Sequence, residues 1–250
     1  MQSEYTLLRD AWPERPEMGP ALSRVLMDEV AAGDRGATVR LSRPGRVVAF
    51  GRRDCISPGY PDAVTAARSR GFAAMERIAG GRAAAYTEGT LSLTITIPDP
   101  APARRTSARF EYAAGLARDA LVALGIDARV GEVEGEYCPG AFSVNADGTR
   151  KLVGIGQRMI RGAAHIGFVI AVGDAQTVRD VLDPVYRSLG LDWNPETVGA
   201  VDQDLPSVEL EDMEEALLAQ LAADARLETG SLEPSTVEAA AAIAARFRSP

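Results

Sequence analysis

The chain has 250 residues, of which 46% are hydrophobic and 25% charged, and its mean hydropathy is −0.06. This length can bury a full core as one large domain or as a domain with a small appendage. No apolar run approaches the roughly 20 residues that a membrane span requires, and the N-terminal residues lack the basic-then-apolar pattern of a secretory signal. We therefore predict a cytoplasmic protein with no membrane partner.

The net charge of −8 is unevenly distributed. Residues 191–250 carry 13 acidic residues and 3 arginines, whereas residues 1–190 sum to +2. This shift predicts a main domain over residues 1–190 and an acidic helical extension over residues 191–250 that packs on it. An acidic chain with 6% aromatic residues argues against nucleic acid as a partner. Two cysteines predict free thiols, and a single histidine argues against a histidine-based metal site.

The first half of the chain alternates between helical and strand patterns. Residues 1–20 contain three prolines and are predicted to be extended or irregular. Pro44-Gly45 predicts a hairpin turn between two flanking strands, and Gly80-Gly81 predicts a sharp loop. The apolar spacing predicts helices at 21–32 and 61–70, and strands at 38–42, 46–51, 75–78 and 91–97.

The second half opens with a long amphipathic helix at 106–124. Residues 141–144 and 151–160 flank the sequence NADGT, which predicts a hairpin with Asp147-Gly148 at its tip. Further strands are predicted at 128–131 and 163–172, and further helices at 175–182, 208–225 and 236–247. A sheet with helices between and after its strands predicts an α+β fold.

Three rare residues fall in one stretch, residues 135–167. It holds Cys138, the only lysine (Lys151) and the only histidine (His165) of the chain. A lysine amine can lose its proton when buried and presents a compact charge, which an arginine cannot do. A chain with few lysines could also place its single one here for no functional reason. His165 is open to two interpretations, a packed strand residue or a pocket residue.

Cys138 lies directly before a Pro-Gly turn and becomes a nucleophile if a cation lowers its pKa. Lys151, across the predicted hairpin, is the candidate cation, and it could also hold the oxyanion of an acyl-transfer intermediate. Equal strand lengths about Asp147 would place Lys151 opposite Ser143 and Cys138 opposite Gly156. The alternative is a buried structural cysteine. That structural interpretation is preferred for the other cysteine, which has no lysine or histidine beside it in the sequence.

Glycines mark two further candidate sites. Gly80 and Gly81 lie between Arg77 and Arg82, where the backbone could bend and present N–H groups to a carbonyl or phosphate, although an ordinary turn is the preferred explanation of this pair taken alone. The strands after residue 150 are rich in glycine, which indicates bulges, a backbone close to a ligand, or relief of sheet twist. The glycines concerned are Gly154, Gly156, Gly162 and Gly167. Gln157, between them, could donate to a substrate carbonyl.

Three blocks in order resemble the biotin/lipoate A/B protein ligase family over about residues 20–190. They are residues 46–52 (RVVAFGR), residues 77–86 (RIAGGRAAAY) with Gly89-Thr-Leu91, and residues 151–158 (KLVGIGQR). The segment YCPGAFS at residues 137–143, followed by the lysine block, sharpens the match. It is similar to the cysteine-dependent octanoyltransferases, especially those that move octanoyl from the glycine cleavage H protein to other lipoyl domains.

The resemblance implies a mixed, largely antiparallel sheet with flanking helices and additional C-terminal helices. It implies that Cys138 takes an acyl group as a thioester and that Lys151 binds the acyl carbonyl. The residues implied to bind the octanoyl or lipoyl group are Arg77, Gly80, Gly81, Arg82, Gly154, Gln157 and His165. The implied partners are lipoyl-domain proteins (glycine cleavage H protein, 2-oxoacid dehydrogenase acyltransferase subunits) or acyl carrier protein, with no cofactor and no metal.

The sequence departs from the family at the glycine loop. Lipoate-protein ligases usually show Arg-x-x-Gly-Gly-Gly-Ala-Val-Tyr-His-Asp followed by Gly-Asn, whereas this chain has Arg82, Thr87, Glu88 and Thr90 at four of those positions. Two alternatives stay open beside the transferase. One is an ATP-dependent lipoate or octanoate ligase of the same fold, which needs no cysteine. The other is a non-catalytic protein that binds a lipoyl domain or an acyl ligand.

Overall fold

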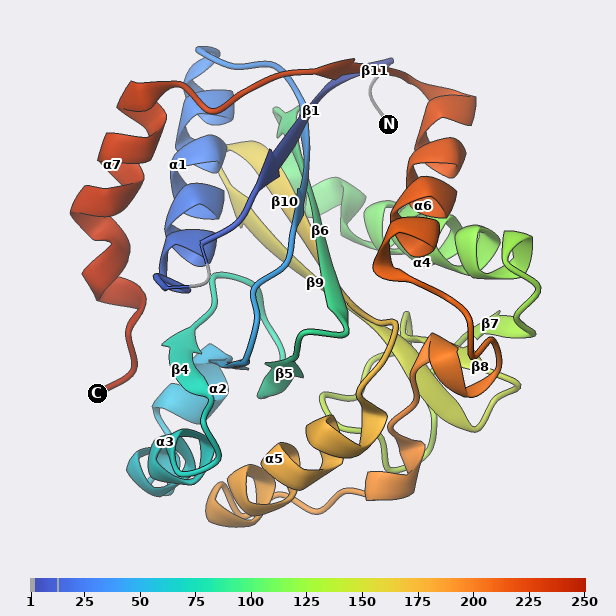
Figure 1. Cartoon of the computed structure of the whole chain (residues 1–250). Helices are drawn as coiled ribbons and strands as arrows, with labels where there is room; N and C mark the ends of the chain where they lie inside the picture. Colours follow the sequence, from blue (N-terminus) through green and yellow to red (C-terminus); the bar gives the residue numbers. More distant parts are fainter. Residues whose placement is uncertain (1–2, 13) are drawn as a thin grey trace.

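The computed structural model describes residues 3–12 and 14–250. Within these residues, eight strands form one mixed sheet, mostly antiparallel, that runs through the molecule (Figure 1). Only its first three strands pair in parallel, β1 with β2 and with β11. The spatial order is β11 (Arg226–Thr229), β1 (Glu4–Asp10), β2 (Thr38–Ser42), β6 (Thr90–Asp99), β10 (Gly162–Ala171), β9 (Arg150–Ile160), β8 (Val144–Ala146) and β7 (Ala128–Val130).

Three further strands of the described chain form a small sheet, with β3 (Val47–Phe50) between β4 (Ala73–Glu76) and β5 (Ala84–Tyr86). The predicted hairpin between residues 38–42 and 46–51 is therefore wrong, because β2 and β3 belong to different sheets. β2 already pairs with β1 on one side and β6 on the other, so it offers β3 no free edge. Gly45, at φ 72°, turns the chain from one sheet to the other.

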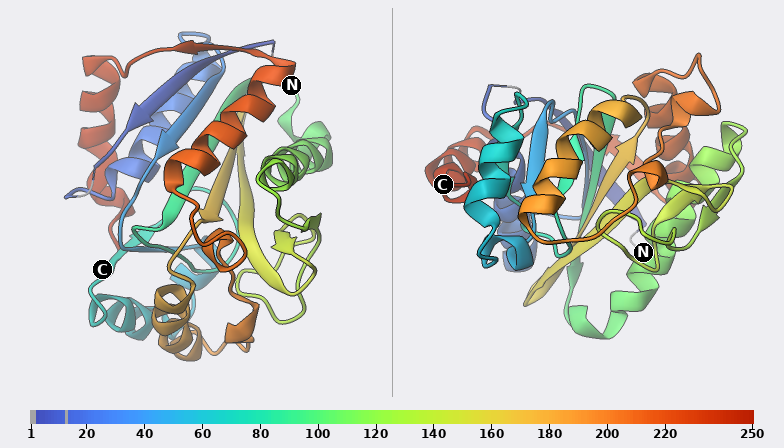
Figure 2. Two further views of the ribbon diagram at one scale, coloured as in Figure 1. Left: turned by 45° about the vertical axis from the view of Figure 1, so that its right-hand side comes forward. Right: turned by 90° about the horizontal axis from the view of Figure 1, so that it is seen from below.

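Helices cover both faces of the large sheet (Figure 1). α1 (Met18–Ala32) and α7 (Pro234–Ala244) pack together on one side, and α4 (Thr106–Ala123) and α6 (Leu210–Asp224) on the other. α3 (Tyr60–Arg68) and α5 (Ala175–Ser188) lie side by side next to the small sheet, as the view from below shows (Figure 2). This arrangement confirms the predicted α+β class with a mixed, largely antiparallel sheet and flanking helices.

The alternation in β6 builds the core under α4. Leu91, Leu93 and Ile95 are at most 1% exposed and pack with Ala117 and Leu121 of that helix. Burying such side chains contributes about 1.5–3 kcal/mol each, an upper estimate. The face predicted from period two is thus the one that the structure buries.

Several boundaries differ from the prediction. The N-terminal segment is extended, as one form of the prediction had it, and forms β1. α1 begins at Met18 and not at residue 21, with Pro20 in its first turn, where a missing N–H costs nothing; Pro13 lies outside the described residues. α5 was predicted to end before Pro184 but continues to Ser188. Its next turn buries Val185 and Tyr186, which offsets the backbone hydrogen bond that the proline removes.

The C-terminal residues contribute to the large sheet as well as to its helical cover. β11, which the sequence did not predict, pairs in parallel with β1 at the sheet edge. β5 and the short helix α2 (Arg52–Cys55) were also not predicted. Among the described residues, no helix has both the length and the apolar character needed to cross a membrane.

Candidate active site

A cavity of about 560 Å³ runs along the face of β9 and β10 that is turned toward α1. This size suits a small-molecule ligand. Its wall includes the loop between β4 and β5 and the loop between β7 and β8. Of the nine residues predicted for the site, the cavity is lined by Arg77, Gly80, Gly81, Cys138, Lys151, Gly154, Gln157 and His165, but not by Arg82.

Cys138 lies in the irregular loop after β7 and not on a strand. The expected register is wrong, because an irregularity between Val144 and Asn145 places Lys151 opposite Asn145. Cys138 has φ 44°, a left-handed backbone conformation that residues other than glycine rarely adopt. Its N–H donates to the Tyr186 hydroxyl at 2.8 Å, which holds this conformation in place.

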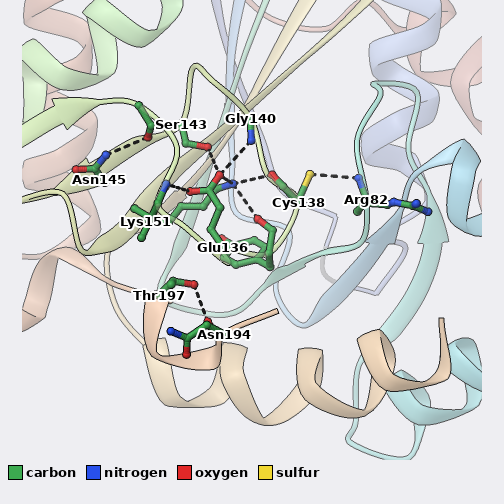
Figure 3. A network of polar contacts seen from close by, with 12 residues as sticks. Arg82, Glu136, Cys138, Gly140, Ser143, Asn145, Lys151, Asn194 and Thr197 are labelled. Atoms are coloured by element: carbon green, nitrogen blue, oxygen red, sulfur yellow. Dashed lines mark hydrogen bonds and ion pairs between the residues drawn. The ribbon is translucent and has the colours of Figure 1, made fainter. Parts of the chain in front are cut away.

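The Cys138 thiol is surrounded by donors. Its Sγ accepts hydrogen bonds from the backbone N–H of Arg82 at 3.2 Å (Figure 3) and from Nη2 of Arg77 at 3.3 Å. Burial raises the pKa of the Cys138 thiol, but the charges of Arg77 and Lys151 and these two hydrogen bonds outweigh it and hold the pKa below its ordinary value. At a given pH a larger fraction of this thiol is therefore ionised than in an ordinary cysteine, and the thiolate is the nucleophilic form.

Cys55 shows the opposite environment. Its Sγ donates to the Gly51 carbonyl at 3.2 Å, and burial raises the pKa of its thiol to about 11. Cys55 also packs against the small-sheet core. The structural role predicted for this cysteine agrees with these contacts.

Lys151 is 1% exposed and is held by an acid that the sequence analysis missed. Its Nζ donates to Oε1 of Glu136 at 2.9 Å and to the carbonyls of Tyr137 and Cys138 at 3.0 and 2.9 Å (Figure 3). An ammonium has three protons, so each has an acceptor. The signal for Glu136 was its place two residues before Cys138, in the loop facing the only lysine.

Glu136 also organises its own loop. Its carboxylate accepts hydrogen bonds from the Ser143 hydroxyl at 2.5 Å, from the Gly140 N–H at 3.2 Å and from the Val133 N–H at 3.1 Å. A buried carboxylate with this many donors needs no water to satisfy it. The loop around Cys138 is thus built on the Glu136–Lys151 pair.

The glycine loop must approach the thiol closely. Gly81 has φ 104°, and a Cβ there would lie 2.7 Å from Cys138 Sγ and 2.4 Å from Arg77 Nη2. Only glycine fits this position. The Arg77 guanidinium also donates to the Arg82 carbonyl, while the Arg82 side chain pairs with buried Asp54 at 3.2 Å, away from the cavity.

Gln157 and Gly154 lie at the floor of the cavity. The Gln157 amide is held between Arg109, whose Nε donates to it at 2.8 Å, and the Thr106 carbonyl, to which it donates at 2.9 Å. A Cβ on Gly154 would stand 3.5 Å from Cε of Lys151, so this glycine leaves room beside the lysine.

His165 forms the inner wall of the cavity. Its Nδ1 shares a hydrogen bond with the Thr96 hydroxyl at 2.8 Å. Burial, with the nearby charge of Arg40, lowers the pKa of His165 to about 3. The imidazole is therefore neutral at physiological pH and serves as a pocket residue.

The fold resembles that of solved lipoate-protein ligases. The fold matches a lipoate-protein ligase A bound with ATP, with a TM-score of 0.78 over 97% of this chain and 95% of that one at 19% identity. A bipartite lipoate-protein ligase from Thermoplasma acidophilum gives a TM-score of 0.75 at 19% identity, over 98% of this chain and 93% of that one. The chain thus has the lipoate-protein ligase fold. The family model of the lipoyl protein ligase A/B catalytic domain matches residues 15–222, so the chain belongs to this family.

Curated relatives agree with this placement. A Geobacillus kaustophilus octanoyl-[GcvH]:protein N-octanoyltransferase is 27% identical over 68% of this chain, and the match spans 60% of that relative. A Listeria monocytogenes lipoyl-[GcvH]:protein N-lipoyltransferase is 26% identical over 73% of this chain and 69% of its own length.

Proposed function

We propose that this protein is an acyltransferase of protein lipoylation. It moves an octanoyl or lipoyl group through a thioester on Cys138 to a lysine of a lipoyl-domain protein. The observation that carries the proposal is the Cys138 Sγ, which lines the cavity and accepts hydrogen bonds from Arg77 and from the Arg82 N–H. The names of the transferases to which the chain is similar support it.

The chemistry is an exchange of acyl groups in two steps. The Cys138 thiolate attacks the acyl carbonyl, the bond to the donor breaks, and the departing group takes a proton from water. The ε-amine of the acceptor lysine then attacks the thioester, loses a proton to water and leaves the acyl group as an amide, which restores the thiolate. When the donor is itself an acyl-lysine, one amide replaces another, and the reaction needs no ATP.

The partners follow from this chemistry. The donor is a lipoyl-domain protein such as the glycine cleavage H protein, or an acyl carrier protein. The acceptor is a lipoyl domain such as that of a 2-oxoacid dehydrogenase acyltransferase subunit. Both would meet Cys138 where Gly80, Gly81 and Pro139 are exposed at the cavity mouth. A cytoplasmic location belongs to the same proposal.

Intact-protein mass spectrometry tests the thioester directly. After incubation with octanoylated H protein or octanoyl acyl carrier protein, in parallel, the protein should gain one octanoyl group that hydroxylamine removes. Cys138→Ala should lose both adduct and transfer, while the matched Cys55→Ala keeps them. Transfer by Cys138→Ala overturns the proposal, and pyrophosphate release from ATP and free octanoate by that variant points to the ligase. Carrier binding without adduct or turnover points to the non-catalytic alternative.

A further inference from the structure

We propose that Arg77, together with the backbone N–H of Arg82, directly holds the negative charge of the reaction, and that Lys151 is a positioning residue. The inference rests on the proposed function and deepens it, because it separates the two cations that flank Cys138. Arg77 would be a catalytic residue in the strict sense, since its guanidinium touches the reacting sulfur.

Arg77 has both the geometry and the spare donors for this role. Its Nη2 lies 3.3 Å from Cys138 Sγ, and the Arg82 N–H lies 3.2 Å from the same atom. Nε of Arg77 is buried and has no hydrogen-bond partner among the described residues. A guanidinium carries five N–H donors, so donors remain for an acyl oxygen next to the sulfur.

Arg77 also lacks a counter-ion. Within the described chain no carboxylate makes an ion pair with it, whereas most of the arginines have one. Arg77 is partly buried. Removing a cation from water without a counter-ion costs free energy unless a negative charge faces it. The charge that faces Arg77 is the Cys138 thiolate.

Lys151 differs on each of these points. Its three protons are bonded to the Glu136 carboxylate and to the carbonyls of Tyr137 and Cys138. Its charge is therefore partly neutralised by an acid at 2.9 Å, and no donor is left for the acyl oxygen. What Lys151 does hold is the backbone of the residue that carries the nucleophile.

The other titratable groups near Cys138 do not compete for this role. They are Tyr86, Tyr137, Tyr186, Asp54 and Glu136. Burial raises the pKa of each of the three tyrosines, so they stay neutral. Asp54 is bonded to Arg82 and Glu136 to Lys151. Arg77 is thus the one facing cation, among the described groups, that forms no ion pair with a carboxylate.

In the acylation step the sulfur lone pair attacks the carbonyl carbon, and the C=O electron pair moves onto oxygen. The Arg77 and Arg82 N–H donors pass from the sulfur, which becomes neutral, to this oxyanion. The oxyanion then collapses, the bond to the donor breaks (the C–N bond when the donor is an acyl-lysine), and the departing group takes a proton from water. The charge stays within reach of one guanidinium throughout.

The experiment measures the rate of Cys138 alkylation by iodoacetamide against pH, in a Cys55→Ser background so that one thiol reports. Arg77→Gln should raise the midpoint by about one pH unit, which slows alkylation about tenfold at pH values below the midpoint. Arg77→Lys restores the charge without the fork, so it should recover most of the alkylation rate but not of octanoyl transfer. The double variant Lys151→Gln/Glu136→Gln, which removes the lysine charge without leaving the acid unpaired, should shift the midpoint less.

A larger midpoint shift in the double variant than in Arg77→Gln would overturn the inference, as would an unchanged midpoint in Arg77→Gln. Circular dichroism of each variant verifies that it is folded, and an unfolded Arg77→Gln leaves Arg77→Lys to decide by its split between alkylation and transfer. The alkylation readout needs no acyl donor. Failure of the proposed function would therefore show in the Cys138→Ala adduct assay, while failure of the Arg77 assignment would show only here.

Discussion

The two ends of the cavity are built from the same kinds of group and behave in opposite ways. At the inner end, the Arg40 guanidinium makes two bonds to Asp10, at 2.5 and 3.0 Å, and a third to the Ser23 hydroxyl. Nδ1 of His165 is likewise hydrogen-bonded to a protein group, the Thr96 hydroxyl. At the thiol end, Arg77 has no carboxylate partner within the described chain and points at Sγ of Cys138.

If the proposed function is correct, this difference separates a reactive polar cluster from a structural one. Where every donor has a protein acceptor, the cluster forms a rigid wall, and its hydrogen bonds offset the free-energy cost of burying its polar groups. Where one cation is left for a titratable atom, that atom holds a charge at a pH where it would otherwise be neutral. Each end also contains an ion pair between two protein side chains, Lys151 with Glu136 and Arg40 with Asp10. We assign these pairs a structural role in the cavity wall and not a role in the reaction.

The largest effect is expected when the Lys151–Glu136 ion pair at the thiol end is broken. Glu136→Gln leaves the Lys151 ammonium buried without a counter-ion, so we expect a loss of about 3–5 kcal/mol in the free energy of unfolding. Urea denaturation measures it. The matched control is Glu88→Gln, which breaks the exposed pair with Arg46 and should cost about 0–1 kcal/mol. Equal costs for the two variants would mean that the thiol-end pair does not hold its loop.

The second test concerns the tie between the two loops. The Tyr186 hydroxyl accepts from the Cys138 N–H at 2.8 Å and donates to the Ala83 carbonyl at 2.9 Å. Tyr186→Phe leaves both backbone groups unpaired, which should cost about 1–3 kcal/mol and slow alkylation of Cys138. Tyr112→Phe is the control, because its buried hydroxyl has no partner among the described residues and its loss should cost nothing. A Tyr186→Phe protein as stable and reactive as wild type would refute the tie.

Features of the fold that depend on neighbouring residues were predictable from the sequence, whereas contacts between distant residues were not. The period of two in residues 91–97 and the Asp147-Gly148 turn predicted β6 and the β8–β9 hairpin, because such patterns depend on neighbouring residues only. The β1–β11 pair joins Glu4 to Arg226, and no local pattern reports which distant strand fills an edge. Residues 226–229 are also mostly exposed, so they lack the apolar signal of a strand.

The site divides in the same way. Rarity within the chain, with the family resemblance, predicted Cys138 and Lys151 as site residues, and eight of the nine predicted residues line the cavity. The separate roles proposed for Arg77 and Lys151 could not be predicted from the sequence. These roles depend on the Cys138–Arg77 and Cys138–Tyr186 contacts, which span 61 and 48 residues, and on the Glu136 carboxylate, which no motif in the sequence singled out.

The third test uses pH at the inner end. His165 has a pKa of about 3 in the folded protein and about 6.5 when unfolded, so the unfolded chain binds its proton first as the pH falls. The contribution of His165 is present above pH 6.5 and is lost progressively below it, about 2 kcal/mol at pH 5. His165→Gln should lack this part of the decline between pH 7 and pH 5. Identical pH profiles of stability for wild type and variant would show that this imidazole is not closed off as described.

The smallest expected effect concerns the length of the cavity. Gly167 lies between the two ends, opposite Gly156 on β9, and a Cβ there would stand 4.0 Å from His165 Nε2 and from Thr94 Cγ2. Gly167→Ala should therefore fit the backbone while displacing about one methylene of an acyl chain, worth about 0.8 kcal/mol. The ratio of kcat/KM for octanoyl over hexanoyl donors should fall about fourfold, since 1.4 kcal/mol is a factor of ten.

Gly154→Ala is the matched variant at the thiol end, where its Cβ would meet Lys151 Cε at 3.5 Å. Both acyl chains pass this point next to the carbonyl, so the octanoyl-to-hexanoyl ratio should stay constant even if both rates fall. A change in that ratio with Gly154→Ala and not with Gly167→Ala would reverse the direction in which the chain enters the cavity. The thiol and the neutral histidine would then no longer mark opposite ends of the bound acyl group.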